Sequence, residues 1–468
     1  AGGGDAGGAI DSLAVLPFAN EGGADGEYLS DGITESLINS FSELPNLKVM
    51  SRNSVFRYKG RGAEAQAAAR ELGVRAVLTG RVAQRGDTLA VSVELTDARD
   101  NRHLWGEQYS RKLSDIFAVQ REIARDISAR LRSRLTGEQM RRVTRSHTDN
   151  VEAYQLYLRG RREWVAHTRQ SLGASVEYYE RAVALDPDYA LAHAGLAYAY
   201  GSLANSGAMP PNEGYLKAKR AAERAVELDD SLAEGHAAVA FVKTFYEWDW
   251  EGARRAALRA IELNPNSSLA HALYADYLTV VGRPEEALVE TTREQELDPL
   301  HPLTNMHLAN SYLLLGRYDE AVARAKRVIE LDPKFPVGYQ VLGSAYVERG
   351  MHAEGIAAFE EAFKAAGREP SYLALVAHAH AVAGRRAEAL KTLGEMQAAA
   401  ERRHVPAYWF ALVHAGLGDT DKTFAWLDKA YAERFFLLKF LKVDPRFAHL
   451  RPDPRFAALL ERMGLPAD

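Results

Sequence analysis

Short apolar runs and alternating segments are spread over the first 140 residues. The run 13–18 is continuously apolar, which is typical of a buried strand. Segments 76–84 and 88–96 alternate apolar and polar positions, and the Arg85-Gly86-Asp87 turn between them predicts a β-hairpin. Two further strands are expected, over 47–51 and 103–109.

Helical periodicity separates these strands. Helices are expected over 31–42, 63–72 and 113–135. The last of them carries its apolar side chains on one stripe: Ile116, Val119, Ile123, Ile127 and Leu131. The order of strands and helices predicts a small α/β domain with a mixed sheet.

From about residue 150 the pattern becomes periodic. Five glycines fall 34 residues apart, at Gly282, Gly316, Gly350, Gly384 and Gly418. Five positions after them stand the small residues Ala287, Ala321, Gly355, Ala389 and Thr423, and seven positions before them stand Ala275, Ala309, Gly343, Ala377 and Ala411. Proline-containing stops recur at 185–187, 263–265, 297–299 and 331–333, where a helix cannot continue. A fixed period of this length is typical of stacked helix hairpins.

These columns resemble the tetratricopeptide consensus. The resemblance covers residues 150–434 and implies an all-α, right-handed superhelix of about eight hairpins, so the chain is expected to be mostly α overall. A loop over 205–213 interrupts the second hairpin, and Trp248-Asp249-Trp250 replaces the turn glycine of the third. The two tryptophans are expected to pack between hairpins rather than to form a ligand cage.

The chain is therefore expected to have four parts. They are a Gly-rich linker over 1–11, the α/β domain over 12–140, the repeat array over 150–434 and a capping helical tail over 435–468. Because the chain starts at Ala1 without Met, we expect it to be a processed product or an excised piece. The linker lacks the basic start and apolar core of a signal peptide.

Composition narrows the function classes. A formal net charge of −5 does not favour specific nucleic-acid binding, which needs a basic surface. The chain has no cysteine, which excludes disulfides, thiolate metal sites and cysteine nucleophiles. No apolar run approaches the roughly 20 residues of a membrane span. The compartment stays open between the cytoplasm and an extracytoplasmic position, where a missing upstream segment would provide the membrane anchor.

No grouping of residues predicts catalysis, a metal or a cofactor. The kinase and Walker signatures are absent. Asp31 and Gly32 are interpreted as a helix N-cap with a turn glycine rather than as a phosphate site. His378 and His380 are two positions apart and point to different helix faces, so packing is the preferred interpretation. The chain is accordingly expected to be no enzyme.

A basic run lies where the two domains join. It comprises Arg130, Arg132, Arg134, Arg141, Arg142 and Arg145. It could hold an acidic partner, a lipid headgroup or nucleic acid, but a solvated helix face that pairs with acidic residues of the array is preferred. The run lacks the interleaved aromatic residues that single-strand binding favours.

The amino-terminal domain resembles the TolB-like (FlgO-like) family. The resemblance rests on Ala14-Val-Leu-Pro-Phe18, Asp31-Gly-Ile-Thr-Glu35, Ser51-Arg-Asn-Ser-Val-Phe-Arg-Tyr-Lys-Gly60, Glu71-Leu-Gly-Val74, His103-Leu-Trp105, Tyr109 and Asp115-Ile-Phe-Ala-Val-Gln120. In that family the domain often precedes a tetratricopeptide array, in the carboxy-terminal part of bacterial serine/threonine kinases, adenylate cyclases or winged-helix regulators. The tail, with Phe440-Leu-Lys-Val-Asp-Pro-Arg-Phe447 and Asp453-Pro-Arg-Phe456, is similar to the closing segment of such chains. The resemblance implies that a kinase or cyclase domain belongs upstream of this chain.

The concave groove of the array is the expected binding site, for a protein or a peptide. The period places seven residues there: Asp276, Met306, Asn310, Gln340, Ser344, His378 and Tyr408. The chain is thus interpreted as a sensory or scaffolding module of a bacterial signalling protein. Two alternatives stay open, an envelope assembly factor and an enzyme with an unrecognised site at the domain junction. The oligomeric state is not predicted.

Overall fold

The computed structural model describes residues 10–23, 26–60, 65–131, 136–166 and 168–465. The chain divides into two compact units. Unit 1 comprises residues 1–242, 256–270 and 297–299, and unit 2 comprises 243–255, 271–296 and 300–468. Unit 1 holds the α/β domain with the first helix pairs of the array, and unit 2 holds the later pairs and the tail. Most of the predicted linker 1–11 lies outside the described residues.

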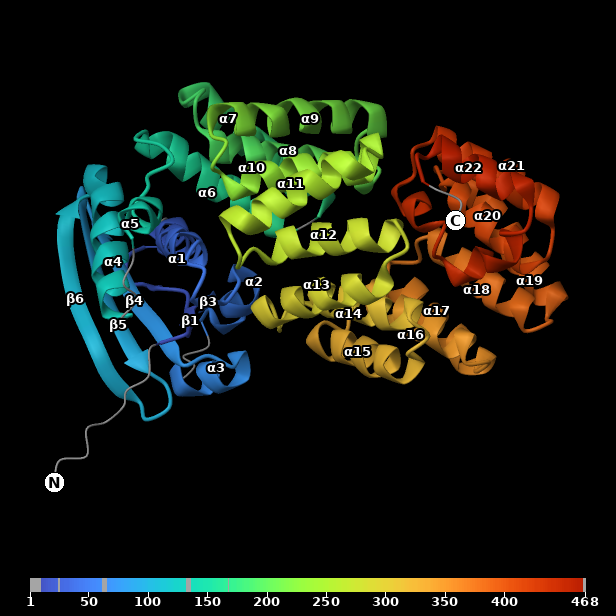
Figure 1. Ribbon diagram of the computed structural model, residues 1–468, viewed down its shortest axis with the longest axis horizontal. Helices are drawn as coiled ribbons and strands as arrows, with labels where there is room; N and C mark the ends of the chain where they lie inside the picture. Colours follow the sequence, from blue (N-terminus) through green and yellow to red (C-terminus); the bar gives the residue numbers. More distant parts are fainter. Residues whose placement is uncertain (1–9, 24–25, 61–64, 132–135, 167, 466–468) are drawn as a thin grey trace. The chain divides into compact units, whose positions relative to one another are not determined.

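The α/β domain contains a mixed sheet (Figure 1). The described strands are β1 (Ser12–Val15), β2 (Ala19–Asn20), β3 (Lys48–Val49), β4 (Ala76–Arg85), β5 (Thr88–Asp97) and β6 (Arg102–Lys112). Their order is β3-β1-β4-β5-β6, and β2 also pairs with β4. β1 runs parallel to β3 and β4, whereas β4, β5 and β6 pair antiparallel. The predicted mixed sheet is confirmed, and β2 is an additional two-residue strand.

Helices α1 and α4 pack along this sheet. The helices of the domain are α1 (Glu27–Ser42), α2 (Arg52–Val55), η2 (Phe56–Tyr58), α3 (Ala65–Leu72), η3 (Leu113–Asp115), α4 (Ile116–Arg130) and α5 (Gly137–Val143). The predicted apolar stripe of α4 is buried, since none of its five residues is more than 1% exposed. The ends of two predicted helices, at 63–64 and 132–135, lie outside the described residues.

The interpretation of Asp31 and Gly32 as a cap and a turn is wrong. α1 already begins at Glu27, with Gly26 as its N-cap, so both residues lie inside the helix. A Cβ on Gly32 would stand 2.1 Å from Cδ1 of Leu158. The glycine is there because α1 approaches α6 (Val151–Ala166) closely, and not because the chain turns.

One buried amide ties the α/β domain to the array within unit 1. Asn266 follows the Leu-Asn-Pro stop and is 5% exposed. Its Nδ2 donates to the carbonyl oxygens of Ser42, Leu44 and Leu47 at 2.8, 3.3 and 2.8 Å, and its Oδ1 accepts from the N–H of Val49 at 3.3 Å. The side chain of Asn266 therefore provides hydrogen-bond partners for backbone groups at the end of α1 and at β3 that do not take part in strand pairing.

A residue of the next stop, at 297–299, also bonds to the α/β domain. Asp298, which is 1% exposed, accepts hydrogen bonds from Ser54 Oγ at 2.5 Å and from Asn53 Nδ2 at 3.0 Å. The carbonyl of Leu297 accepts from the N–H of Ser51 at 2.8 Å. The loops that end two array helices thus hold the β3–α2 segment.

A buried ion cluster supports the same junction. Glu35 of α1 accepts from Arg52 Nε at 2.9 Å and from Arg161 Nε at 2.7 Å. Burial raises the pKa of Glu35, but the charges of Arg161 and Arg52 outweigh it and hold that pKa below its usual value. A buried carboxylate between two guanidinium groups is stable only while both partners stay in place.

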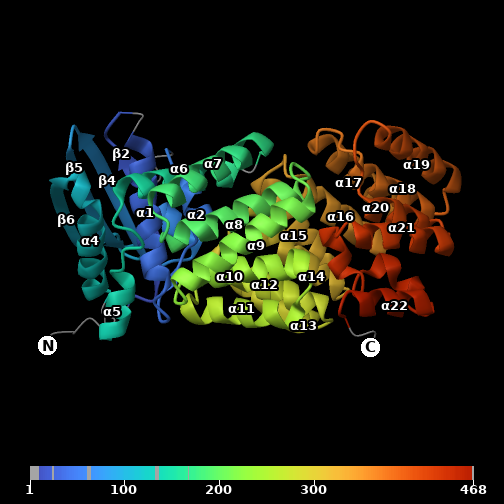
Figure 2. The same ribbon diagram turned by 90° about the horizontal axis from the view of Figure 1, so that it is seen from above.

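The array consists of consecutive helix pairs (Figure 2). In the described residues the pairs are α6 with α7 (Arg169–Leu185), α8 (Ala190–Asn205) with α9 (Pro211–Leu228), α10 (Ala233–Val242) with α11 (Trp250–Leu263), α12 (Ser268–Val280) with α13 (Pro284–Leu297), α14 (Pro302–Leu314) with α15 (Tyr318–Leu331), α16 (Pro336–Glu348) with α17 (His352–Ala365), α18 (Ser371–Val382) with α19 (Arg386–Ala400), and α20 (Ala407–Gly416) with α21 (Thr420–Ala432). The predicted all-α repeat array is confirmed.

The five periodic glycines are equivalent turns, as predicted. All have positive φ, from 70° to 85°. At each turn the glycine N–H donates to the carbonyl three residues earlier, and the next N–H donates to the carbonyl five residues before it. At Gly316 these bonds reach Leu313 at 3.1 Å and, from Arg317, Tyr312 at 2.9 Å. This left-handed helix end accommodates glycine without strain, which explains the period.

The small columns let the two helices of a pair approach each other. Ala309 and Ala321 are 0% exposed. A Cβ on Gly343 would stand 2.6 Å from the ring of Phe359 and 3.0 Å from the carbonyl oxygen of Gly355. Larger side chains in these columns would push the helices of a pair apart.

Trp248 occupies the position that glycine holds in the other turns. Its φ is 56°, and a π-helix, η4 (Lys243–Glu247), comes directly before it. Its ring lies 5.6 Å from that of Tyr431 of α21, and Trp250 Nε1 donates to the carbonyl of Met463 at 2.8 Å. The tryptophans are packed, as expected, but against the end of the chain rather than only between neighbouring hairpins.

The tail forms η5 (Phe436–Phe440), η6 (Pro445–Leu450) and α22 (Pro454–Arg462). Each Asp-Pro-Arg-Phe motif folds alike. The carboxylates of Asp444 and Asp453 cap the helix that follows by accepting from the N–H two residues later, at 3.0 and 2.9 Å. The phenylalanines of the two motifs, Phe447 and Phe456, are 0% and 3% exposed.

Asn266→Asp tests the junction within unit 1. The change places a carboxylate against three carbonyl oxygens, so the free energy of unfolding should fall by roughly 3 kcal/mol. The measurement is urea denaturation monitored by circular dichroism. Gln397→Glu, the same chemical change on an exposed face of α19, is the control and should change stability by less than about 0.5 kcal/mol. Equal effects of both changes would contradict the role of Asn266.

Ala321→Trp tests the register of the repeats. The large side chain cannot fit between α14 and α15, so we expect a loss of about 1–3 kcal/mol from overpacking. Ala323→Trp, on an exposed position of the same helix, is the matched control. The two variants are compared by thermal melting, and an unchanged midpoint for Ala321→Trp would refute the assigned register.

Candidate functional site

The predicted groove residues all lie on first helices of unit 2. They are Asp276 of α12, Met306 and Asn310 of α14, Gln340 and Ser344 of α16, His378 of α18, and Tyr408 of α20. They do not form one free surface, because the tail contacts the residues at both ends of this set.

The first end is covered by Lys439 of η5. Its Nζ lies 2.6 Å from Oδ2 of Asp276 and 3.4 Å from the ring centre of Phe245, and the side chain is 1% exposed. Burial lowers the pKa of Lys439, and the Asp276 carboxylate only partly offsets this effect. Asp276 is therefore a docking point for the chain's own tail.

The other end is covered by the first Asp-Pro-Arg-Phe motif. The hydroxyl of Tyr408, which is 1% exposed, donates to Asp444 Oδ2 at 3.0 Å. Nη2 of Arg446 donates to the same carboxylate at 2.7 Å and to the Tyr408 oxygen at 3.1 Å. Burial raises the pKa of Asp444, but the charge of Arg446 outweighs it and holds that pKa below its usual value. Tyr408 is thus part of a closed hydrogen-bonded cluster.

The middle of the set stays accessible. Asn310, Gln340 and Ser344 are partly exposed. Nδ2 of Asn310 lies 2.9 Å from the sulfur of Met306, a weak acceptor, and Met306 is 9% exposed. Polar groups that are not fully engaged can exchange their bonds for those of a ligand.

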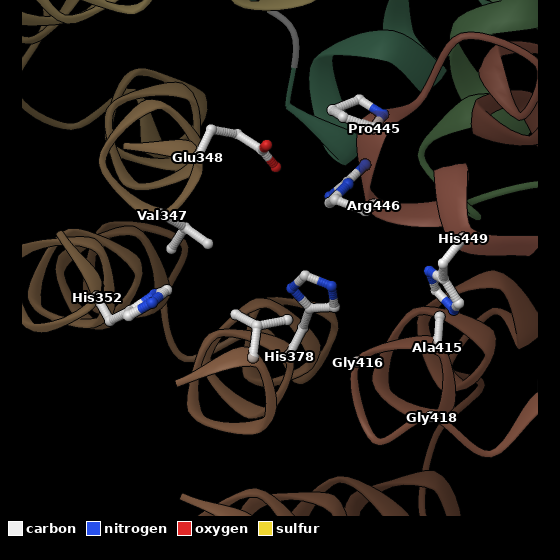
Figure 3. Close-up of a pocket in the computed structure, with 11 residues that line it drawn as sticks. Val347, Glu348, His352, His378, Ala415, Gly416, Gly418, Pro445, Arg446 and His449 are labelled. Atoms are coloured by element: carbon white, nitrogen blue, oxygen red, sulfur yellow. The ribbon is translucent and has the colours of Figure 1, made fainter. Parts of the chain in front are cut away.

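Beside the tail lies a cavity of about 370 Å³ (Figure 3). Five polar side chains line it: Glu348 of α16, His352 of α17, His378 of α18, and Arg446 and His449 of η6. We call this cavity the histidine pocket. Glu348, His378 and Arg446 point toward the same open space.

Tight packing fixes the base of the histidine pocket. A Cβ on Gly416 would stand 2.8 Å from Cδ2 of His378 and 3.2 Å from the Cβ of Ala381. Glycine at this position lets α20 approach α18 and leaves the imidazole of His378 facing the cavity. Val347, Val382 and Pro445 add apolar wall.

Burial shifts the pKa values of the ionisable side chains in the pocket. Burial and, to a smaller extent, the charge of Arg446 together lower the pKa of His378 to about 3, so this imidazole is neutral at pH 7. Burial and the negative charge of Asp444 raise the pKa of Glu348, while Arg446 opposes them. Burial also lowers the pKa of His449. The pocket therefore contains neutral imidazoles between a carboxyl group and a guanidinium group.

The arginines of the basic run at the domain junction differ in the acidic residues that they contact. Arg145 pairs with Asp229 at 2.5 Å, which agrees with the preferred interpretation that it contacts acidic residues of the array. Arg142 pairs with Glu138 on its own helix. Arg132 and Arg134 lie outside the described residues.

The described residues contain no group of three or more His, Asp or Glu side chains that could hold a metal ion. No described helix combines the length and the apolar character needed to cross a membrane.

Comparison with known families gives two matches. Residues 9–126 match the profile described as HilA/YgeH-like transcriptional regulator, second domain. Residues 304–335 and 338–368 match the tetratricopeptide repeat. The chain thus carries tetratricopeptide repeats, whereas the match of its amino-terminal domain is to a HilA-like rather than to the expected TolB-like family.

Relatives are known at moderate and at low identity. A protein named "Putative adenylate cyclase 3" from Rhizobium meliloti (strain 1021) is 39% identical over 234 residues, which are 49% of this chain and 39% of that protein. Among solved structures, the APC/C hetero-tetramer Cut9-Hcn1 has 17% identity and a TM-score of 0.44, covering 75% of this chain and 63% of that one. The type IV pilus biogenesis factor PilW has 17% identity and a TM-score of 0.37, covering 44% and 95%.

Lys439→Met tests the docking of the tail. It keeps the apolar stem but leaves Asp276 without its ion pair, so the tail should be destabilised by about 2–4 kcal/mol. The measurement is hydrogen exchange of the amides of 436–447, which should become faster. Lys364→Met, at a lysine whose side chain is 61% exposed, should leave this exchange unchanged. Tail protection that survives Lys439→Met would show that the ion pair does not hold the tail.

Proposed function

We propose that this chain is a non-enzymatic, protein-binding regulatory module of a bacterial signalling protein. The tetratricopeptide repeats support the binding role, because such repeats build surfaces for other proteins. The relative that is named an adenylate cyclase supports the signalling context, and the chain covers 39% of its length. The HilA-like match also supports a regulatory role, because that family is described as a domain of transcriptional regulators.

We infer that the partner is a protein or peptide segment that lies across α14 and α16. The observation that carries this proposal is the contrast along the predicted groove. Asp276 and Tyr408 are engaged by the tail, whereas Asn310, Gln340 and Ser344 keep partly exposed polar groups. A mixed polar and apolar wall suits a peptide that bonds through its backbone and inserts one apolar side chain near Met306.

The two alternatives, an envelope assembly factor and an enzyme with a site at the domain junction, have weaker support. For an enzyme at the domain junction, the best candidate group is Glu43, whose pKa burial and the nearby Glu234 raise to about 8. Burial also raises the pKa of Glu234. Such shifts occur in structural clusters as well as in active sites. Glu43 still provides a definite residue for testing the enzyme alternative.

The double variant Asn310→Ala with Gln340→Ala should bind the partner at least about fivefold more weakly, because a few anchors carry most of the binding energy. The partner is first identified by crosslinking and mass spectrometry, and affinity is then measured by calorimetry. Gln295→Ala with Gln397→Ala removes two amides from the second helices α13 and α19 and should leave affinity unchanged. Equal affinity of both double variants would rule out the groove.

The purified chain should show no turnover of ATP, GTP or common ester substrates, since the sequence carries no kinase or Walker signature and the described residues hold no metal-binding group. Activity is measured with the wild-type chain and with Glu43→Gln in parallel. Turnover that Glu43→Gln abolishes would overturn the non-enzymatic proposal in favour of a catalytic junction. Turnover that persists in the variant and co-purifies with the chain would also overturn the proposal and would place the site away from Glu43.

A further inference from the structure

We propose that the histidine pocket binds a free amino acid with an apolar side chain. The cavity of about 370 Å³ lies within the usual range of sites for small molecules. It is bounded by α16, α17, α18, α20 and η6, so it forms only when the tail is docked. This role goes beyond the binding of a protein partner by α14 and α16.

Two imidazoles of the pocket have ring nitrogens that make no hydrogen bond to the described part of the chain. His378 is 6% exposed and makes no hydrogen bond within the described residues, and its ring faces the cavity (Figure 3). Nδ1 of His352 is buried and also makes no hydrogen bond to the described part of the chain. Buried polar atoms are normally satisfied. Both imidazoles line the pocket, so their ring nitrogens are available to a molecule bound there.

The charged side chains of the pocket favour a zwitterionic ligand, which carries one positive and one negative group. Glu348 and Arg446 face the cavity, and in the described residues no hydrogen bond or ion pair joins them. Nε and Nη2 of Arg446 are engaged by Asp444 and Tyr408, which fixes the guanidinium and leaves Nη1 for a ligand. An ammonium group would give Glu348 its missing counter-charge, and a carboxylate would reach Nη1 of Arg446.

Ligands of a single charge fit less well. Asp444 already neutralises Arg446, and Glu348 adds negative charge, so an anion alone gains little. A cation alone would lie close to Arg446. The ring nitrogens of His378 and His352 can form hydrogen bonds with a carboxylate or an ammonium group. Val347, Val382 and Pro445 then contact the side chain of the ligand.

The test uses the full chain and each of the twenty common L-amino acids at millimolar concentration. A ligand that binds the folded state raises the melting temperature, and calorimetry then gives its affinity. One or a few apolar amino acids are expected to bind. The N-acetyl derivative lacks the ammonium group and the amide derivative lacks the free carboxylate, so both should fail to bind.

Two variants locate the binding. Glu348→Gln removes the carboxylate, and Val382→Trp fills the pocket from a position that is 41% exposed. Each should weaken binding by at least about tenfold. Glu360→Gln and Leu390→Trp repeat these changes on exposed positions of α17 and α19 and should leave affinity unchanged.

Three results would overturn the proposal. The first is that no amino acid binds, which would make the cavity a packing gap. The second is equal binding of the N-acetyl derivative, which would point to a peptide carboxyl terminus held by Arg446 alone. The third is unchanged affinity in Glu348→Gln, which would place the ligand elsewhere.

Discussion

The left-handed turn that ends each first helix is the constraint on which the array depends. Only a residue with positive φ allows both hydrogen bonds of this turn to form, so glycine recurs there at the same spacing. Once the turns are fixed, the columns of small residues are brought face to face. Gly343 and Gly355 show how little room is left, since a Cβ on the first would meet the carbonyl of the second. The repeat period is thus a consequence of backbone geometry.

The tail changes what this array can offer to a ligand. In a plain stack of hairpins the first helices would present a continuous wall. Here Lys439 and Asp444 engage the two ends of that wall and leave its middle open. The same segment provides Arg446 and His449 to the histidine pocket. The tail is therefore part of the candidate site as well as a cap for the last hairpin.

Local rules predicted the elements well and the long-range contacts poorly. Periodicity identified the mixed sheet, the stripe of α4 and the equivalent glycine turns. It failed at Gly32, because a glycine that permits close helix packing looks the same in sequence as a turn glycine. Nothing in the sequence singled out Asn266, which directly follows a helix stop, yet its partners lie 217 to 224 residues away. The polar side chains at the tail were missed for the same reason, although the Asp-Pro-Arg-Phe motif was a visible signal.

The contact of Trp248 and Trp250 with the end of the chain has a consequence for cooperativity. Stacked repeats usually interact only with their neighbours, so they fray from the ends in steps. The bond from Trp250 to Met463 spans 213 residues and joins the start of unit 2 to its last segment. Loop closure of that length is costly until both ends are formed. Unit 2 should accordingly unfold in one transition, which hydrogen exchange would show as equal protection of its first and last helices, and its folding should be slower than that of an open array.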